Sequence, residues 1–349
     1  MIMFTKKQVN EIRGHLERAQ NPIFFFDNDA DGLCSFLLFQ RYIGRGKGVP
    51  IKSFPDFVED YFRKVREFES DYIFILDKPV VSAKFFEEAE KLGINVVWID
   101  HHLIDKKEVP NFVHYYNPLF NRKKSDEPVT ALCYQVTKKE DDLWILVVGC
   151  VSDKFVPKEY SKFKKDYPDL SIDSEEPFDI YYRSQIGRIA KMINFGLKDR
   201  TTNVMNMTRF LLKVKNPSEV FEENSKNQTM HYRYNQIESK YQKLLMKAKS
   251  VGDASGRLLF FHYGGDLSIS GDLSNELSYL FGNKIIVVLY AKGTKVNISM
   301  RGDGVRDIFE RAIEKIDGVR GGGHENAIGG QMNTGDVEAF RMNLEKIIG

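Results

Sequence analysis

Cysteine is scarce in this chain. Only three of the 349 residues are cysteines, and Cys34, Cys133 and Cys150 lie far apart in apolar surroundings. An odd number of scattered cysteines forms neither a disulfide framework nor a thiolate cluster for a metal ion. We therefore expect three buried, reduced thiols that serve packing.

Long hydrophobic runs are also missing. The apolar runs, such as residues 144–148 and 285–290, fall far short of the ~20 residues that a membrane-spanning helix needs. The N-terminal residues 1–7 lack the apolar core of a secretory signal. The sequence thus predicts no membrane association and a cytoplasmic location.

Neither sign of charge dominates, because 51 Lys and Arg residues balance 49 Asp and Glu residues for a net charge of +2. A protein that coats long nucleic acid by electrostatics alone needs a dense basic surface. The balance argues against such a protein and leaves a local basic groove open. The length suits two domains, each large enough to bury its own core.

Residues 22–153 alternate short β-type runs with helical patterns, which is typical of βαβ units around a mostly parallel sheet. The predicted strands are continuous apolar runs, as expected where helices cover both faces of a sheet, and they span 23–26, 72–76 and 94–99. Helices are expected at 33–42, 82–92, 128–136 and 143–151. The mixed, charge-rich stretch 154–217 is expected to hold helices and loops. The fold class is α/β.

A second α/β pattern follows residue 256. Apolar residues at four- and three-residue steps between Met230 and Ala248 predict a connecting helix, whose basic face is either merely solvated or a nucleic-acid contact. Beyond it we expect strands at 258–261, 285–290 and 296–300, helices at 273–280, 305–316 and 337–348, and a glycine-rich loop at 321–324. A turn at 292–294 predicts a hairpin.

The first cluster with chemical meaning is Asp27-Asn28-Asp29-Ala30-Asp31-Gly32, where a strand passes into a helix. Three carboxylates in five residues repel one another unless a cation lies among them. An EF-hand calcium loop is excluded, because a strand precedes the cluster and Leu38 stands at the twelfth position, where a glutamate is needed. Taken alone, the cluster is either a metal site or a capped strand–helix turn.

The second cluster is Asp100-His101-His102, at the end of another apolar strand. Imidazole ligands favour transition metals over magnesium or calcium. In an open parallel sheet, ligands bind beyond the carboxyl ends of the strands, and Asp77 also follows a strand. Three strand ends are therefore expected to converge on one metal centre.

These motifs, in this order, resemble those of the DHH phosphoesterases. The resemblance includes the triple-aspartate run at Asp27, the lone Asp77, the Asp100-His101-His102 motif, the Asn117-Pro118 pair and Asp153. The segment 321–327 with Gly329-Gly330 resembles the C-terminal DHH-associated domain of the same family. The resemblance implies a metal-binding domain at 1–220, a connecting helix at 221–252 and a smaller substrate-binding α/β domain with a mixed sheet at 253–349. It also implies an active site in the cleft between the domains.

The resemblance implies two divalent metal ions, with Mn²⁺ favoured over Mg²⁺ or Co²⁺. One ion would be held by Asp29 and Asp77 with Asp27 nearby. The ligands of the other would be Asp31, Asp77, His101 and Asp153. Asp77 would bridge the two ions, and Asp100 would orient His101.

The resemblance also assigns residues to the substrate. His102 would face the substrate phosphate, which makes Asp100, His101 and His102 the expected catalytic group. Phosphate contacts are further expected from the C-terminal domain, at Arg301, Gly321, Gly322, Gly323 and His324. A guanidinium suits bidentate phosphate recognition, and successive glycine N–H groups can form an anion-binding concavity.

The implied chemistry is two-metal hydrolysis of a phosphoester, without a protein nucleophile. The triple-aspartate motif favours a RecJ-like exonuclease that degrades single-stranded DNA or RNA to mononucleotides. Alternatives are an oligoribonuclease that also dephosphorylates adenosine bisphosphate, a cyclic-dinucleotide phosphodiesterase, and a non-catalytic partner in a DNA replication or repair complex. The expected partner is single-stranded nucleic acid or a short oligonucleotide. A replication or repair protein partner and a homo-oligomer are left open.

Overall fold

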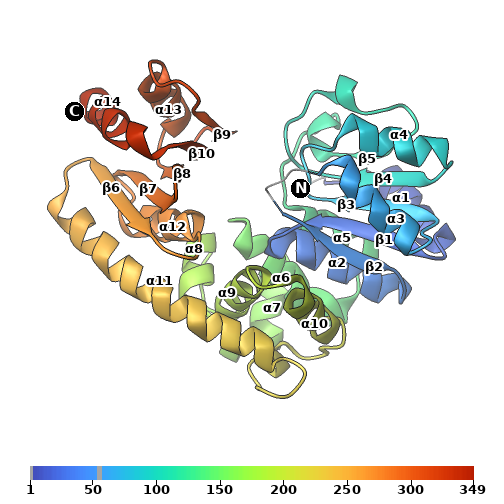
Figure 1. Cartoon of the computed structure of the whole chain (residues 1–349). Helices are drawn as coiled ribbons and strands as arrows, with labels where there is room; N and C mark the ends of the chain where they lie inside the picture. The colour runs from blue at the N-terminus through green and yellow to red at the C-terminus, as the bar shows by residue number, and fades with distance from the viewer. Residues whose placement is uncertain (1–2, 53–56) are drawn as a thin grey trace. The chain divides into compact units, whose positions relative to one another are not determined.

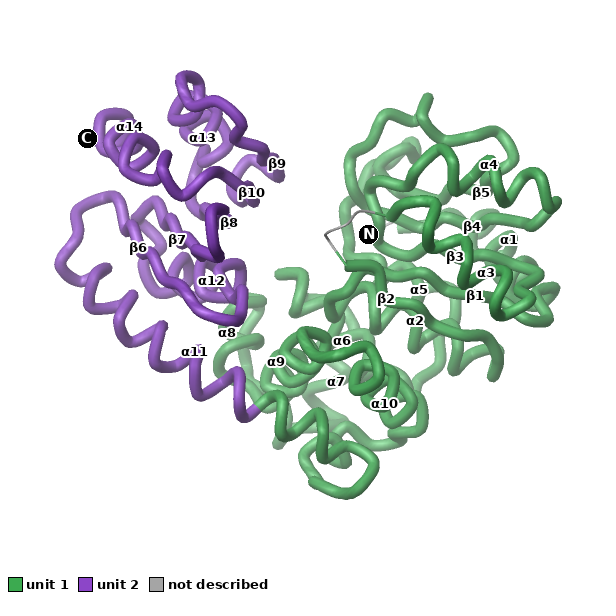
Figure 2. Tube along the Cα trace, viewed as in Figure 1, with its two compact units in different colours: residues 1–234 green, residues 235–349 purple. Residues whose placement is uncertain are grey.

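The computed structural model describes residues 3–52 and 57–349. The chain divides into two compact units, Met1–Tyr234 and Asn235–Gly349 (Figure 2). The boundary falls within the long helix α11 (Gln228–Ala254). Met230, Ile237 and Ala248 of this helix are buried, which confirms the helical spacing expected there. The domain limits at residues 220 and 252 stay predictions.

The first unit is built on a five-stranded parallel sheet in the order β2-β1-β3-β4-β5 (Figure 1). Its strands are β1 (Pro22–Asp27), β2 (Lys47–Ile51), β3 (Tyr72–Leu76), β4 (Asn95–Ile99) and β5 (His114–Tyr116). The three strands expected from apolar runs are therefore confirmed. The edge strand β2 was not expected, because Gly48 and Pro50 weaken the strand pattern of its sequence.

Helices cover both faces of this sheet, which explains the continuous apolar run of β1. On one face, the rings of Phe24 and Phe26 lie with centroids 5.4 and 5.3 Å from that of Phe36 in helix α2 (Ala30–Ile43). On the other face, Phe25 packs against Phe85 of helix α4 (Ala83–Lys91) at 5.5 Å. Successive side chains of a strand point to opposite faces, so each face of β1 is apolar.

The remaining helices of the first unit lie before, between and after the strands along the chain. They are α1 (Lys6–Arg18), α3 (Phe62–Glu67), α5 (Val129–Thr137), α6 (Leu143–Ser152), α7 (Tyr160–Asp166), α8 (Pro177–Arg183), α9 (Gln185–Leu197) and α10 (Thr201–Leu211). Short 3-10 turns lie at Glu59–Tyr61, Lys106–Glu108, Pro118–Phe120, Glu140–Asp142, Pro168–Leu170 and Pro217–Val220. The helix-and-loop character expected for 154–217 is confirmed by α7 to α10.

The second unit carries a mixed sheet in the order β6-β7-β8-β10-β9, in which β6 and β7 are parallel and the other pairs antiparallel. The strands are β6 (Leu258–Gly264), β7 (Ile285–Lys292), β8 (Lys295–Arg301), β9 (Arg320–His324) and β10 (Ala327–Asn333). The helices are α12 (Ser270–Leu280), α13 (Val305–Ile313) and α14 (Val337–Ile348), with a 3-10 turn at Thr334–Asp336. The hairpin expected at 292–294 is confirmed.

One expectation for the second unit is wrong. Residues 321–324 form the edge strand β9, paired with β10, and not a loop. Glycine has a low strand propensity, so a run of three glycines carries no strand signal in the sequence. The pairing of Gly321 with Gly330 and of Gly322 with Gly329 nevertheless builds a regular antiparallel ladder.

The three cysteines are buried, as expected from their apolar surroundings in the sequence. Cys34, Cys133 and Cys150 are free thiols with no exposed surface. Among the described residues, no helix is both long and apolar enough to cross a membrane.

Candidate metal centre

The turn from β1 into α2 brings three carboxylates to one end of the sheet. Asp27 ends β1, Asp29 caps α2 by accepting the N–H of Gly32 at 2.9 Å, and Asp31 lies in the first turn of the helix. A Cβ at position 32 would lie 2.4 Å from the carbonyl oxygen of Asp27. Glycine is therefore required for a turn this tight, and the tight turn gathers the carboxylates.

Asp31 is held by a second helix. Its side-chain oxygens accept the backbone N–H groups of Val129 at 2.9 Å and of Thr130 at 2.8 Å, in the first turn of α5. The residue is only 2% exposed. Burial raises the pKa of Asp31 well above its usual range, and the charges of Asp77 and Asp153 add to the rise. Asp31 is thus held in a fixed position, and a nearby cation would stabilise its ionised form.

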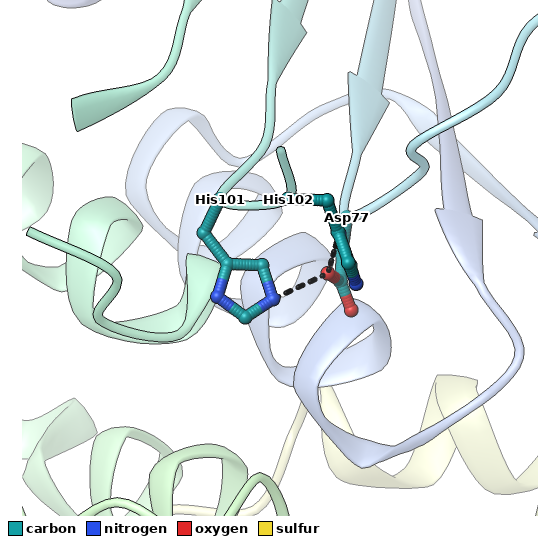
Figure 3. Close-up of side chains that lie close together, drawn as sticks. All are labelled: Asp77, His101 and His102. Carbon is teal, nitrogen blue, oxygen red and sulfur yellow. Dashed lines mark ion pairs between the residues drawn. The ribbon is translucent and has the colours of Figure 1, made fainter. Parts of the chain in front are cut away.

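Asp77 follows β3 in a backbone conformation that is uncommon for a residue other than glycine, with φ at 61°. Its N–H donates to the carbonyl of Ile99 at 3.0 Å. Its buried Oδ1 has no hydrogen bond and faces Nε2 of His101 at 3.4 Å and Nδ1 of His102 at 3.8 Å (Figure 3). A buried carboxylate oxygen without a hydrogen bond is costly unless another partner binds it. This orphaned oxygen fits a metal ligand.

The residues after β4 correct one expectation. Oδ1 of the fully buried Asp100 lies 2.8 Å from Nδ1 of His102, so Asp100 contacts His102 and not His101. The reason is that residues two apart in an extended chain point to the same side. Nδ1 of His101 instead lies 3.2 Å from the carbonyl oxygen of Asp126. That contact suits an Nδ1–H donor, which leaves Nε2 of His101 as the metal-binding atom.

The structure gathers the predicted ligands into groups whose donor atoms all lie within 4.8 Å of one another. The groups are Asp27 with Asp29 and Asp77, Asp31 with His101 and Asp153, and Asp77 with His101 and His102. Asp153, at the end of α6, places Oδ2 3.8 Å from Nε2 of His101. Asp77 belongs to two of these three groups and His101 to two, and such a set of carboxylate and imidazole donors fits divalent transition-metal ions.

The charges of this centre shift the pKa values of its members. Burial alone would lower the pKa of His101, but the carboxylates of Asp77, Asp153 and Asp31 raise it to about 11. Burial raises the pKa of Asp153 to about 6, against the opposing effect of His101, with Asp77 adding to the rise. Perturbed pKa values of this kind cluster at functional sites.

Two residues of this region were not predicted from the sequence. Lys78 reaches Oδ1 of Asp27 with its Nζ at 3.0 Å. Asn194 of α9 accepts the N–H of Ala30 at 3.0 Å and donates to the hydroxyl of Tyr181 at 3.2 Å. No pattern in the sequence pointed to either residue. A lysine is usually exposed, and Asn194 lies 164 residues from Ala30 in the chain.

The five predicted phosphate contacts lie in the second unit. Arg301 ends β8, where its Nε donates to Oδ1 of Asn275 at 2.6 Å and its Nη1 to the carbonyl of Met300 at 2.7 Å. These bonds orient the guanidinium. The exposed His324 ends β9.

The three glycines of β9 differ in what they are needed for. A Cβ on Gly321 would lie 2.7 Å from the ring of Phe309, and one on Gly323, with φ at 151°, would lie 2.2 Å from the carbonyl oxygen of Ala327. Both glycines are therefore required by packing. A Cβ on Gly322 would meet open space, so packing within the protein does not require glycine at this position.

Comparison with known families agrees with both units. The family described as "DHH family, N-terminal domain" matches residues 23–148, and the DHHA1 domain matches residues 254–349. Among curated proteins, nothing matches. Among solved structures, the chain is similar to RecJ from Thermus thermophilus in complex with Mn²⁺, with a TM-score of 0.70 and 15% identity over 98% of this chain and 54% of that one.

Two further solved structures share the fold. An exonuclease RecJ bound to manganese has a TM-score of 0.64 and 14% identity, over 98% of this chain and 93% of that one. A pGpG-specific phosphodiesterase from Vibrio cholerae has a TM-score of 0.52 and 11% identity, over 94% of this chain and 99% of that one. Because the chain spans only about half of the Thermus protein, the likeness is one of fold. With both family domains matched in order and the fold shared, the chain belongs to the DHH phosphoesterase superfamily.

Proposed function

We propose that this protein is a metal-dependent phosphodiesterase that removes mononucleotides from an end of single-stranded DNA or RNA. The observation that carries the proposal is the convergence of carboxylate and imidazole donors from several strand and helix ends around the buried Asp77. A protein without a bound cation gains nothing from gathering carboxylates that repel one another.

Asp27, Asp29 and Asp77 would hold one divalent ion, and Asp31, His101 and Asp153 would hold the other beside the shared Asp77. Bound ions of this kind activate a water molecule near neutral pH and neutralise charge on the phosphoryl group that is transferred. The protein itself holds the ligand side chains in fixed positions. Asp31 is fixed by two N–H groups of α5, and Nε2 of His101 faces Asp77. Mn²⁺ is the proposed ion, because imidazole ligands favour it over Mg²⁺.

His102 is the proposed phosphate ligand and proton donor. Its Nδ1 is engaged with Asp100, so its Nε2 is the atom that would meet a substrate. Burial would lower the pKa of His102, but the carboxylates of Asp100 and Asp77 raise it. A protonated imidazole then donates a hydrogen bond to the phosphate and a proton to the leaving oxygen. Arg301, Gly322 and His324 of the second unit are proposed to bind substrate phosphates.

A second candidate function is hydrolysis of dinucleotides. The specific observation in its favour is the likeness to the pGpG-specific phosphodiesterase, which extends over 94% of this chain. Base stacking and terminal phosphate contacts provide most of the binding energy for such short substrates. The two candidates share the metal centre and differ in the length of strand that is cleaved.

The test is digestion of labelled single strands and of a dinucleotide in the presence of Mn²⁺. A RecJ-like exonuclease shortens a long labelled strand stepwise to mononucleotides, and labels at the 5′ and 3′ ends report the polarity. Cleavage of the dinucleotide alone would replace the leading proposal with the second one. A His101→Ala variant serves as the inactive control, and Lys84→Met, on an exposed lysine of α4, as the active one.

A further inference from the structure

A buried lysine lies inside the acidic centre. Lys78 is 6% exposed, and its Nζ lies 3.0 Å from Oδ1 of Asp27. Lysine is among the residues least often buried, and its burial is stable only with an anionic partner. The backbone of Lys78 is also held, because its carbonyl oxygen accepts the indole N–H of the buried Trp98 at 2.8 Å. The ammonium group is therefore a fixed part of the centre.

The position of Lys78 makes the two groups of metal donors unequal. The ammonium group lies at the group formed by Asp27, Asp29 and Asp77. It has no lone pair and cannot bind a metal ion, so it stays there as a positive charge. In the other group, the residue that faces the carboxylates is His101, whose ring nitrogen can itself be a ligand.

The lysine that follows the second group in sequence is placed differently. Lys154 comes directly after Asp153, and its Nζ lies over the ring of Phe178, 5.5 Å from the ring centroid. The ammonium group of Lys78, by contrast, lies within hydrogen-bonding distance of a carboxylate oxygen of Asp27. Lys78 therefore places its ammonium group in direct contact with a ligand oxygen of the Asp27–Asp29–Asp77 position.

We propose that Lys78 is an internal counter-cation that holds Asp27 in the metal-free protein and makes the Asp27–Asp29–Asp77 position the weaker of the two metal positions. The inference rests on the proposed two-metal function and adds a form of regulation to it. The stronger position fills first, and the weaker one fills only when the Mn²⁺ concentration is high enough to overcome repulsion by the ammonium group. Activity then follows the concentration of the metal.

The experiment is a Mn²⁺ titration by calorimetry, with electron paramagnetic resonance to count free Mn²⁺. It compares the wild type with Lys78→Met, which keeps the length of the side chain and removes the charge, and with Lys78→Gln, which keeps an N–H donor for Asp27. Lys84→Met, at a lysine 72% exposed in its side chain, is the matched control. A melting curve in chelator and one in Mn²⁺ are recorded for each protein.

The expected result is that both uncharged variants bind the second Mn²⁺ about tenfold more tightly or better, since a unit charge a few ångströms from a divalent ion is removed. The first binding step is expected to stay within about twofold. Lys78→Met is expected to melt at a lower temperature in chelator, because Asp27 loses its partner, and to recover in Mn²⁺. Lys84→Met should match the wild type in every measurement.

A second binding step that is unchanged or weaker in both Lys78 variants would overturn the inference. The inference is supported if the wild type binds two Mn²⁺ ions unequally and the second binding step tightens in the Lys78 variants. This holds even if the protein digests no nucleic acid. The lack of digestion would contradict only the proposed function. Failure of the wild type to bind any Mn²⁺ would overturn both.

Discussion

Nδ1 of His102 lies 2.8 Å from Oδ1 of Asp100, and Asp100 is completely buried beneath it. The pair fixes the orientation of the ring and favours its protonated form. Because Asp100 contacts His102, we expect Asp100 to act on the proposed chemistry through that ring.

Asp100→Asn should therefore lower kcat about 10–100-fold while leaving the number of bound Mn²⁺ ions unchanged. The amide can still accept a hydrogen bond from His102 but no longer stabilises its positive charge. Steady-state kinetics and a Mn²⁺ titration of the same preparation check this. Asp105→Asn, at an exposed aspartate of the same loop, should behave as the wild type. Full activity of Asp100→Asn would refute this role.

Trp98 is expected to hold the backbone next to Asp77. In Trp98→Phe the carbonyl of Lys78 loses its indole donor, and a buried carbonyl without a partner costs about 1–3 kcal/mol of unfolding free energy. Activity should fall as well, because the position of Asp77 depends on this segment. Urea unfolding in chelator and kinetics in Mn²⁺ measure the two effects.

Trp144 provides the matched control for this change. It is similarly buried, but its indole nitrogen has no hydrogen-bond partner. Trp144→Phe therefore alters packing without breaking a hydrogen bond, and it should leave the affinity for Mn²⁺ and kcat near those of the wild type. Equal effects of the two substitutions on Mn²⁺ binding would show that the bond from Trp98 does not position Asp77.

The glycines of β9 allow a structural role to be separated from a functional one. Gly323→Ala forces a Cβ to within 2.2 Å of the carbonyl oxygen of Ala327 and should destabilise the second unit by about 1–3 kcal/mol. Gly322→Ala adds a methyl group in open space and should leave stability unchanged. If Gly322 lies against a substrate phosphate, its variant raises KM for nucleic acid. Unchanged kinetics of Gly322→Ala would leave β9 with a packing role only.

A loss of stability at low pH is expected from His15, which is not one of the proposed metal ligands. His15 is buried, and burial, followed by the positive charges of His114 and Arg18, lowers its pKa from 6.5 to about 4. Tyr72 and Arg18 both lie against its Nδ1, at 3.0 and 3.1 Å, and Arg18 can only donate. The folded protein therefore holds His15 neutral.

The sign of the effect follows from linkage. The unfolded chain binds a proton at His15 more readily than the folded chain. The contribution of His15 to the unfolding free energy is therefore complete above pH 6.5 and is lost as the pH falls toward 4. The full loss is about 3 kcal/mol. His15→Asn, which keeps an acceptor for Arg18, should flatten the fall of unfolding free energy across this window. Urea unfolding in chelator at a series of pH values measures this. The same dependence of unfolding free energy on pH in His15→Asn and in the wild type would contradict the prediction.

Much of the metal centre could be predicted because its residues follow strands of a parallel sheet. The apolar runs fix where β1, β3 and β4 end, and the carboxyl ends of parallel strands meet at one edge, so Asp27, Asp77 and His101 had to lie near one another. Asp31 belongs to the same acidic cluster as Asp27, and Asp153 joined the group through the family resemblance. The expected pairing of Asp100 with His101 was wrong, because the sequence alone does not show which of two adjacent histidines faces Asp100.

Other features had no local signal. The strand β9 was mistaken for a loop because its glycines have no side chains to show a strand pattern. Lys78 could not be recognised as buried, because its partner Asp27 lies 51 residues earlier and lysines at strand ends usually reach solvent. Asn194 is likewise linked to the metal turn only by tertiary packing.

The measurement that tests the central claim most directly is Mn²⁺-dependent digestion of a labelled single strand by the wild type and by Asp77→Asn. Asp77 is the carboxylate shared by the two proposed metal positions, so its loss should affect both ions. The account predicts stepwise release of mononucleotides by the wild type and a fall of about 1,000-fold or more in Asp77→Asn, with loss of tight Mn²⁺ binding. Comparable digestion by both proteins, or no Mn²⁺-dependent cleavage of any phosphodiester by the wild type, would contradict it.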